Sequence, residues 1–173
     1  MPTRHQAPSS PWFSATLFGF PNPVNEKAAR VVAGFVALLA VAGLVTGWMW
    51  LLPLMAVGFW LRVASGPRYS PIGQIATRIL APRLGTPKMV PGPPKRFAQT
   101  IGAVTTTVGA FLALPLGIEA AGYVVFAIMA VFATLESVFA LCVGCQIFAR
   151  LMRAGIIPQE VCEACADISL RRA

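Results

Sequence analysis

The chain has 173 residues, of which 57% are hydrophobic and only 12% charged, and its mean hydropathy is +0.71. An ordinary soluble domain carries about 25% charged residues, so this composition excludes that class and indicates an integral membrane protein. The net charge of +8 comes from 14 Lys and Arg against 6 acidic residues, an excess that in a membrane protein indicates topology rather than nucleic-acid binding.

Residues 1–24 form an N-terminal segment that we expect on the cytoplasmic side. Its start is rich in Pro and aromatic residues and lacks a short apolar core with a cleavage site, so we expect no cleavable secretory signal. The segment cannot span a bilayer. Aromatic residues such as Trp12 and Phe13 favour an interfacial anchor, and a partly disordered tail is the alternative.

Residues 25–149 are predicted to form a membrane domain with four spans. Asn25 is suited to cap a helix, and Glu26 would lie near its positive end. Residues 31–61 contain no charged residue, which is too long for one straight helix and sufficient for two short ones joined by a turn at Gly47. We therefore predict spans over residues 28–45 and 48–63.

The loop at residues 64–96 is basic and has no acidic residue, so the positive-inside rule places it in the cytoplasm. Ile72, Ile75 and Ile79 recur at helical spacing with polar residues on the other face, which predicts a short amphipathic helix on the inner leaflet. Nucleic-acid binding is the competing interpretation. The charges are interrupted by Pro and apolar residues, and an anionic lipid surface accounts for them, so we expect the lipid bilayer and no nucleic acid as partner.

Spans three and four are predicted over residues 97–115 and 121–148. The cytoplasmic segments then hold every Lys and Arg except Arg62, which ends span two at the same surface, and the two outer turns hold none. The expected fold is an all-α, multi-pass protein of the inner (plasma) membrane with both termini in the cytoplasm. It has four transmembrane helices, an amphipathic helix on the cytoplasmic face and a short C-terminal helix.

The four cysteines lie near the C-terminal end, two where span four ends and two in the tail at residues 150–173. Cys142 and Cys145 form one Cys-x-x-Cys pair, and sixteen residues separate it from a second pair, Cys162 and Cys165. This spacing fits a four-thiolate metal site, either zinc or iron–sulfur, and a metal would offset the cost of thiolates at the bilayer edge. A metal-tied structural or accessory subunit of a larger membrane complex is therefore one hypothesis.

Dithiol chemistry uses the same four residues as catalytic groups. One pair would exchange electrons or sulfur with the other, and a thioredoxin-like or rhodanese-like protein would meet the tail. Pro158 marks a helix start that places Cys162 where a helix N-terminus favours a thiolate, whereas Cys142 and Cys145 are expected to end a helix and gain no such help. A third interpretation is that the cysteines only pack as small apolar residues.

Glu136 is the other candidate, an ionisable residue expected near the middle of span four. Within an unbroken helix it lies well around the axis from both sulfurs, so direct partnership with them is not expected. It would act as a proton relay or contact the hydroxyls of Thr105–Thr107, as in a small transporter. The alternative is a protonated packing residue.

Several stretches together resemble a bacterial membrane-protein family catalogued as domain of unknown function 4395. They are Pro23-Val24-Asn25 with Arg30-Val31, Gly66-Pro67-Arg68-Tyr69-Ser70-Pro71, Pro94-Lys95-Arg96-Phe97-Ala98-Gln99 and Cys142-Val143-Gly144-Cys145. The resemblance implies a four-span membrane domain, and the family's occurrence near thioredoxin- and rhodanese-like proteins implies sulfur or thiol metabolism. Glu136 stands where the family leads us to expect a neutral polar residue, often Asn. No established activity comes with the family, so whether the chain is an enzyme stays open.

Overall fold

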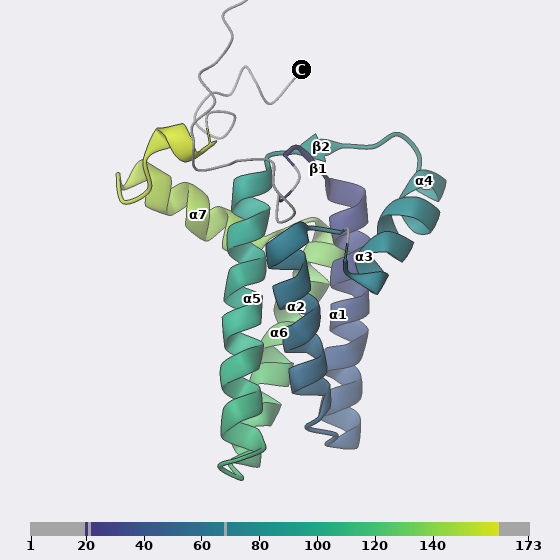
Figure 1. Ribbon diagram of the computed structural model, residues 1–173, viewed down its shortest axis with the longest axis vertical. Helices are drawn as coiled ribbons and strands as arrows, with labels where there is room; N and C mark the ends of the chain where they lie inside the picture. Colours follow the sequence, from purple (N-terminus) through teal and green to yellow (C-terminus); the bar gives the residue numbers. More distant parts are fainter. Residues whose placement is uncertain (1–19, 21, 68, 163–173) are drawn as a thin grey trace, which may run out of the picture.

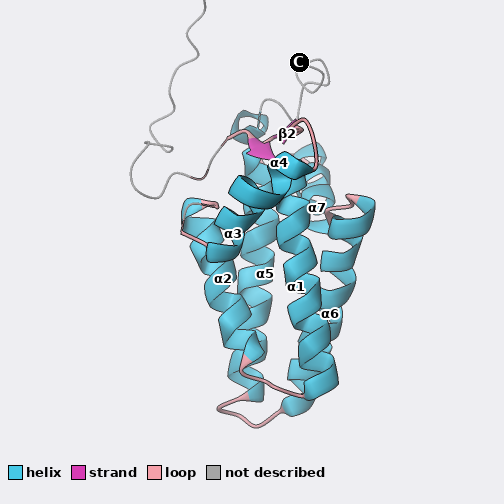
Figure 2. Ribbon diagram, turned by 90° about the vertical axis from the view of Figure 1, so that its right-hand side faces the viewer, coloured by secondary structure: helices cyan, strands magenta, loops and turns pink. Residues whose placement is uncertain are grey.

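Four long helices run up and down in a bundle in the computed structural model, which describes residue 20 and residues 22–67 and 69–162 (Figures 1 and 2). They are α1 (Glu26–Thr46), α2 (Leu51–Ser65), α5 (Gly92–Ala113) and α6 (Glu119–Phe139). The described part is helical apart from loops and one pair of two-residue strands. The expected all-α class is therefore confirmed.

The first helix is delimited by the residues that the sequence suggested. Asn25 caps α1, because its side-chain oxygen accepts a hydrogen bond from the backbone N–H of Lys27 at 3.0 Å. Gly47, with φ 67°, ends α1 in the left-handed conformation that glycine adopts without steric cost. Residues 48–50 make the turn, so α2 begins at Leu51, three residues after the predicted start.

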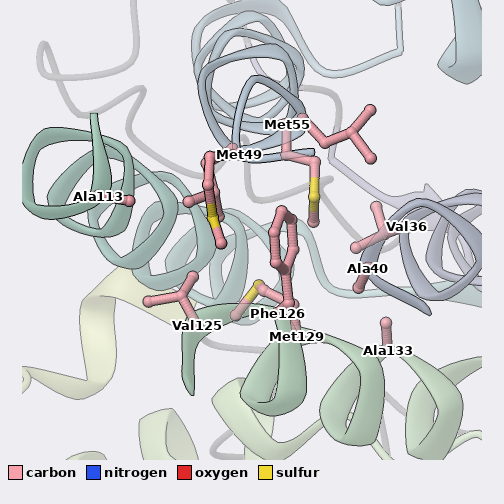
Figure 3. Packing of buried hydrophobic residues seen from close by; sticks show 11 residues of the cluster. Val36, Ala40, Met49, Met55, Ala113, Val125, Phe126, Met129 and Ala133 are labelled. Atoms are coloured by element: carbon pink, nitrogen blue, oxygen red, sulfur yellow. The ribbon is translucent and has the colours of Figure 1, made fainter. Parts of the chain in front are cut away.

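The bundle core lies between two helix pairs, α1 with α6 and α2 with α5. Phe126 of α6 is fully buried at its centre, between methionines from α2 and α6 (Figure 3). Its ring approaches α1 at Gly43, where a Cβ atom would lie 2.4 Å from a ring carbon. A glycine on α1 therefore allows the aromatic ring to fill the space between the helices.

The basic loop folds against the same end of the bundle where α1 begins. Helical turns α3 (Pro71–Ile75), η2 (Ala76–Leu80, a π-helical turn) and α4 (Ala81–Arg83) follow one another and lie beside α1. Small residues face inward, whereas Ile75 and Ile79 are exposed. Where the sequence predicted one short amphipathic helix, the chain therefore forms these three consecutive helical turns.

A strand pair that the sequence did not predict fastens the end of this loop. β1 (Val24–Asn25) and β2 (Met89–Val90) pair antiparallel, with Val24 opposite Val90. Next to them, Lys88 forms an ion pair with Glu26 at 2.8 Å. The proline-rich end of the basic loop then enters α5 at Gly92, five residues before the predicted start of span three. Pro lies in the first turn of α5, where it is tolerated.

The prediction of one helix over residues 121–148 is wrong. α6 ends at Phe139, Ala140 adopts a left-handed conformation with φ 57°, and a separate helix α7 (Val143–Arg153) begins after it. Arg30 of α1 explains the break, because its guanidinium donates hydrogen bonds of 3.0 Å to the carbonyls of Ser137 and Val138. Carbonyls at a helix end need such partners, and α7 can then leave the bundle axis and cross the end of α5 (Figure 1).

A short 3-10 turn, η3 (Gln159–Cys162), stands where the sequence predicted a C-terminal helix. The predicted interfacial anchor at residues 1–24 falls largely outside the described residues, as does Cys165.

Two helices of the described part, α1 and α6, are long and apolar enough to cross a membrane, and α2 is a shorter apolar helix. By length and composition they support a membrane location.

Candidate thiol site

Cys142 and Cys145 lie together at the beginning of α7. The Cys142 sulfur caps the helix by accepting the backbone N–H of Cys145 at 3.4 Å, and the two sulfurs are 2.6 Å apart. Our expectation that this pair ends a helix is therefore wrong. Both residues are at the N-terminus of α7, where the helix dipole favours a thiolate.

The two thiols are electrostatically unequal. The thiol of Cys145 donates a hydrogen bond to the Cys142 sulfur, which lowers the pKa of Cys142 even though burial opposes the charge. The same bond, together with burial, raises the pKa of Cys145. Cys142 is thus the thiol that ionises first, and Cys145 is the neutral thiol beside it.

Gly144, between the two cysteines, brings α7 against α5. A Cβ atom on Gly144 would lie 2.5 Å from the Cβ of Ala98, which explains the small residue in the Cys-x-Gly-Cys sequence. One turn further along, the Phe148 ring of α7 packs on Phe97 of α5, with ring centres 5.6 Å apart. The thiol pair is therefore held by a rigid helix contact.

Glu136 pairs with Lys95 of α5, a partner that sequence reasoning missed. Their side chains are 2.6 Å apart and mostly buried, with 22% and 10% of their surfaces exposed. The expected contact with Thr105–Thr107 is wrong, since the hydroxyls of Thr106 and Thr107 donate to backbone carbonyls of their own helix. Glu136 also lies in the last turn of α6 rather than mid-span, because that helix ends at Phe139.

Arg62 of α2 is the second buried cation, and no motif pointed to it. Its side chain is 3% exposed, lies over the Phe59 ring at 4.5 Å, and donates from Nε to the Gln99 side chain at 3.3 Å. Its Nη2 atom has no hydrogen-bond partner among the described residues. A buried donor without a protein partner is costly unless a water, an ion or a ligand accepts its hydrogen bond.

One cavity of about 110 Å³ is lined by Arg62, Lys95, Glu136 and Cys142. The helix break brings Cys142 to the same cavity as Glu136, although an unbroken helix would keep them apart. The Gln99 amide also lines the cavity, and its remaining walls are apolar. Its apolar lining includes Ala29, Phe59, Ile101, Phe132 and Ile147.

Cys162 is disulfide-bonded and packs against Phe148 and Met152, which lie about one to three turns along α7 from Cys142 and Cys145. Cys142 and Cys145 are free thiols. No group of three or more His, Cys, Asp or Glu side chains that could hold a metal occurs within the described residues. Because Cys165 lies outside them, a four-thiolate zinc or iron–sulfur site stays a prediction.

Comparison with known proteins gives a family but no activity. Searches of curated proteins and of solved structures found no match. A family model described as "Domain of unknown function (DUF4395)" matches residues 24–153, which include the four bundle helices, the basic loop and the Cys-x-Gly-Cys sequence. The chain therefore belongs to the DUF4395 family.

Proposed function

We propose that this protein is a four-span inner-membrane partner in dithiol redox or sulfur-transfer chemistry, with Cys142 as nucleophile and Cys145 as resolving thiol. The observation that carries the proposal is the 2.6 Å approach of two free sulfurs at the N-terminus of α7. Small movements convert this contact into a disulfide of about 2.05 Å.

The outer surface of the bundle supports the four-span arrangement. Only 33% and 22% of the apolar windows of α1 and α6 are buried, whereas a core helix of a soluble protein would be mostly buried. Large apolar side chains on all four helices point outward instead, which suits lipid. Examples are Leu38, Val45, Leu54, Val57, Val104, Phe111, Val124 and Val131.

The distribution of Lys and Arg supports an orientation in which the Cys142 end of the bundle faces the cytoplasm. Every described Lys and Arg lies at the end of the bundle that carries the basic loop and α7, and the opposite turns at residues 47–50 and 114–118 contain none. Under the positive-inside rule, the end with Cys142 faces the cytoplasm, as do both termini.

The thiol exchange proceeds by two substitutions at sulfur. The Cys142 thiolate attacks a disulfide of a thioredoxin-like partner, which forms a mixed disulfide and releases one partner thiolate. Cys145 then loses its proton and attacks the Cys142 sulfur, which forms the Cys142–Cys145 disulfide and releases the second partner thiolate. The two partner thiolates take up protons, so one dithiol is oxidised and one disulfide is reduced.

Sulfur transfer uses the same first nucleophile. The Cys142 thiolate attacks the outer sulfur of a persulfide on a rhodanese-like partner, which leaves a persulfide on Cys142 and a thiolate on the partner. Attack of Cys145 on Cys142 would then expel hydrosulfide and form the same intramolecular disulfide. Both reactions therefore depend on Cys142 and end at Cys145.

Thiol trapping tests the proposal on the full chain. Reduced protein is mixed with an oxidised thioredoxin-like protein or a persulfide-carrying rhodanese, and thiols are counted by a maleimide mass shift. We expect Cys142 and Cys145 to oxidise together, Cys145→Ser to accumulate a mixed disulfide or persulfide on Cys142, and Cys142→Ser to remain unreacted. The proposal fails if Cys142 and Cys145 stay reduced with the thioredoxin-like protein and also with the persulfide-carrying rhodanese.

A further inference from the structure

The cavity beside the thiol pair reaches the apolar outer surface of the bundle. Three of its lining residues, Ile101 of α5, Phe132 of α6 and Ile147 of α7, are 36%, 44% and 38% exposed. In a membrane this rim faces lipid, so a ligand can enter from the bilayer. A dry cavity of about 150 Å³ holds a benzene ring; the 110 Å³ here is smaller, so a bound ring would extend into the open rim.

Polar groups from α2, α5, α6 and the start of α7 line this cavity beside the apolar side chains. Arg62 has an unpartnered Nη2 donor and is 97% buried, since 3% of it is exposed. Lys95 and Glu136 provide a proton-bearing ion pair, and Cys142 provides the nucleophilic sulfur. The arrangement suits a flat, apolar ligand that carries a hydrogen-bond acceptor and takes up electrons.

We propose that this cavity binds the ring of a lipid-soluble quinone and that the Cys142/Cys145 dithiol reduces it to the hydroquinone. The inference rests on the proposed dithiol function and names its electron acceptor. One carbonyl oxygen of the quinone would accept from Arg62, and the ring would lie against Cys142. A small inorganic anion would also pair with Arg62, but it gains nothing from the apolar walls and rim.

The redox step balances without another reactant. The Cys142 thiolate adds to the quinone ring, and the adduct carries the electron pair of the new carbon–sulfur bond. Cys145, after losing its proton, attacks the Cys142 sulfur, which forms the disulfide and returns that pair to the ring. The hydroquinone oxygens take up two protons, one that Cys145 released through the Lys95–Glu136 pair and one from water. Two electrons thus pass from the dithiol to the quinone.

Anaerobic titration with a short-chain ubiquinone analogue tests this on the purified, reduced, full-length protein in detergent. We expect one hydroquinone, measured by its ultraviolet absorbance, for each Cys142–Cys145 disulfide, with a rate that saturates as quinone increases. Cys142→Ser should abolish the reaction. Arg62→Gln should slow it about tenfold, the effect of one lost hydrogen bond from a charged donor.

Two alanines on α1 provide a matched pair for cavity blocking. Ala29 lines the cavity, so Ala29→Leu should reduce quinone binding, whereas Ala42 is exposed and Ala42→Leu should not. Both variants should still exchange with the oxidised thioredoxin-like protein, which shows that they are folded.

The outcomes separate this inference from the proposed function. If thioredoxin exchange proceeds but quinone is not reduced, or is reduced equally in Ala29→Leu with no saturation, the quinone site is wrong and the dithiol function stands. If thiosulfate protects Cys142 from alkylation and quinone does not, the cavity binds an anion and the quinone site is wrong. If Cys142 reacts with neither partner nor quinone, both proposals fail.

Discussion

Gly144 of α7 lies so close to Ala98 of α5 that a Cβ atom on residue 144 would be 2.5 Å from the Ala98 Cβ and 2.7 Å from its Cα. Backbone on the α5 side cannot move as a flexible side chain can. The position of the thiol pair on α7 is therefore coupled to the packing of two helices rather than to a loop.

Gly144→Ala should push α7 away from α5. Overpacking of this kind costs about 1–3 kcal/mol, and the displacement should slow alkylation of Cys142 because its sulfur moves away from Lys95 of α5, which helps to lower its pKa. Gly58→Ala is the control, since a Cβ there meets only Arg62 Nη1 at an ordinary 3.5 Å. Unfolding midpoints and alkylation rates measure both effects. Equal behaviour of the two variants would contradict the helix-contact argument.

Lys95 and Glu136 should act as one unit. Removing one partner of a buried pair leaves an uncompensated charge and costs about 3–5 kcal/mol, whereas replacing both can be close to neutral. We therefore expect Lys95→Met and Glu136→Gln each to destabilise the fold, and the double variant to recover part of the loss. A double-mutant cycle on unfolding free energies measures the coupling. Strictly additive effects would show that the pair contributes no coupling.

Sequence patterns predicted the parts of the fold that depend on local chemistry. The Asn25 cap, the Gly47 turn and the apolar helices follow from residue preferences and hydropathy, which act within a few positions. The β1–β2 pair joins residues 24 and 90, and such a long-range pairing of two residues each leaves no periodic signal.

The candidate site could be predicted only in part, because sequence patterns report local chemistry and not contacts between distant residues. The Cys-x-x-Cys spacing identified the thiols, but the break at Ala140 depends on Arg30 reaching the end of α6 from another helix. Without that break, Glu136 and Cys142 lie well apart around the axis of one helix. Lys95 and Arg62 read as basic residues of a cytoplasmic surface, and only the packing of the bundle buries them beside the thiols.

Alkylation of Cys142 should show an acid-shifted pH dependence. Its pKa is lowered mainly by the hydrogen bond from Cys145; Lys95 also lowers it, and burial and Glu136 oppose both. A lowered pKa means that the reactive thiolate is already present at pH values where an ordinary thiol is protonated. Iodoacetamide rates measured against pH in a Cys162→Ser, Cys165→Ser background should therefore have a midpoint below the usual thiol value.

Cys145→Ala supplies the comparison for this measurement. It removes the hydrogen-bond donor and keeps the other neighbours, so the pKa of Cys142 should rise and its alkylation at neutral pH should slow. An unchanged midpoint in Cys145→Ala would assign the shift to Lys95 and the helix N-terminus instead.

Membrane topology can be measured at two exposed positions on opposite ends of the bundle. Thr86 lies in the basic loop, and Leu116 lies in the turn between α5 and α6 with half of its surface exposed. In a background with all four cysteines replaced by Ser, Leu116→Cys should react with a membrane-impermeant maleimide in intact spheroplasts. Thr86→Cys should react only after lysis, because the positive-inside rule keeps its basic loop in the cytoplasm. The reverse pattern would invert the topology, and labelling of both residues in intact cells would argue against a membrane between them.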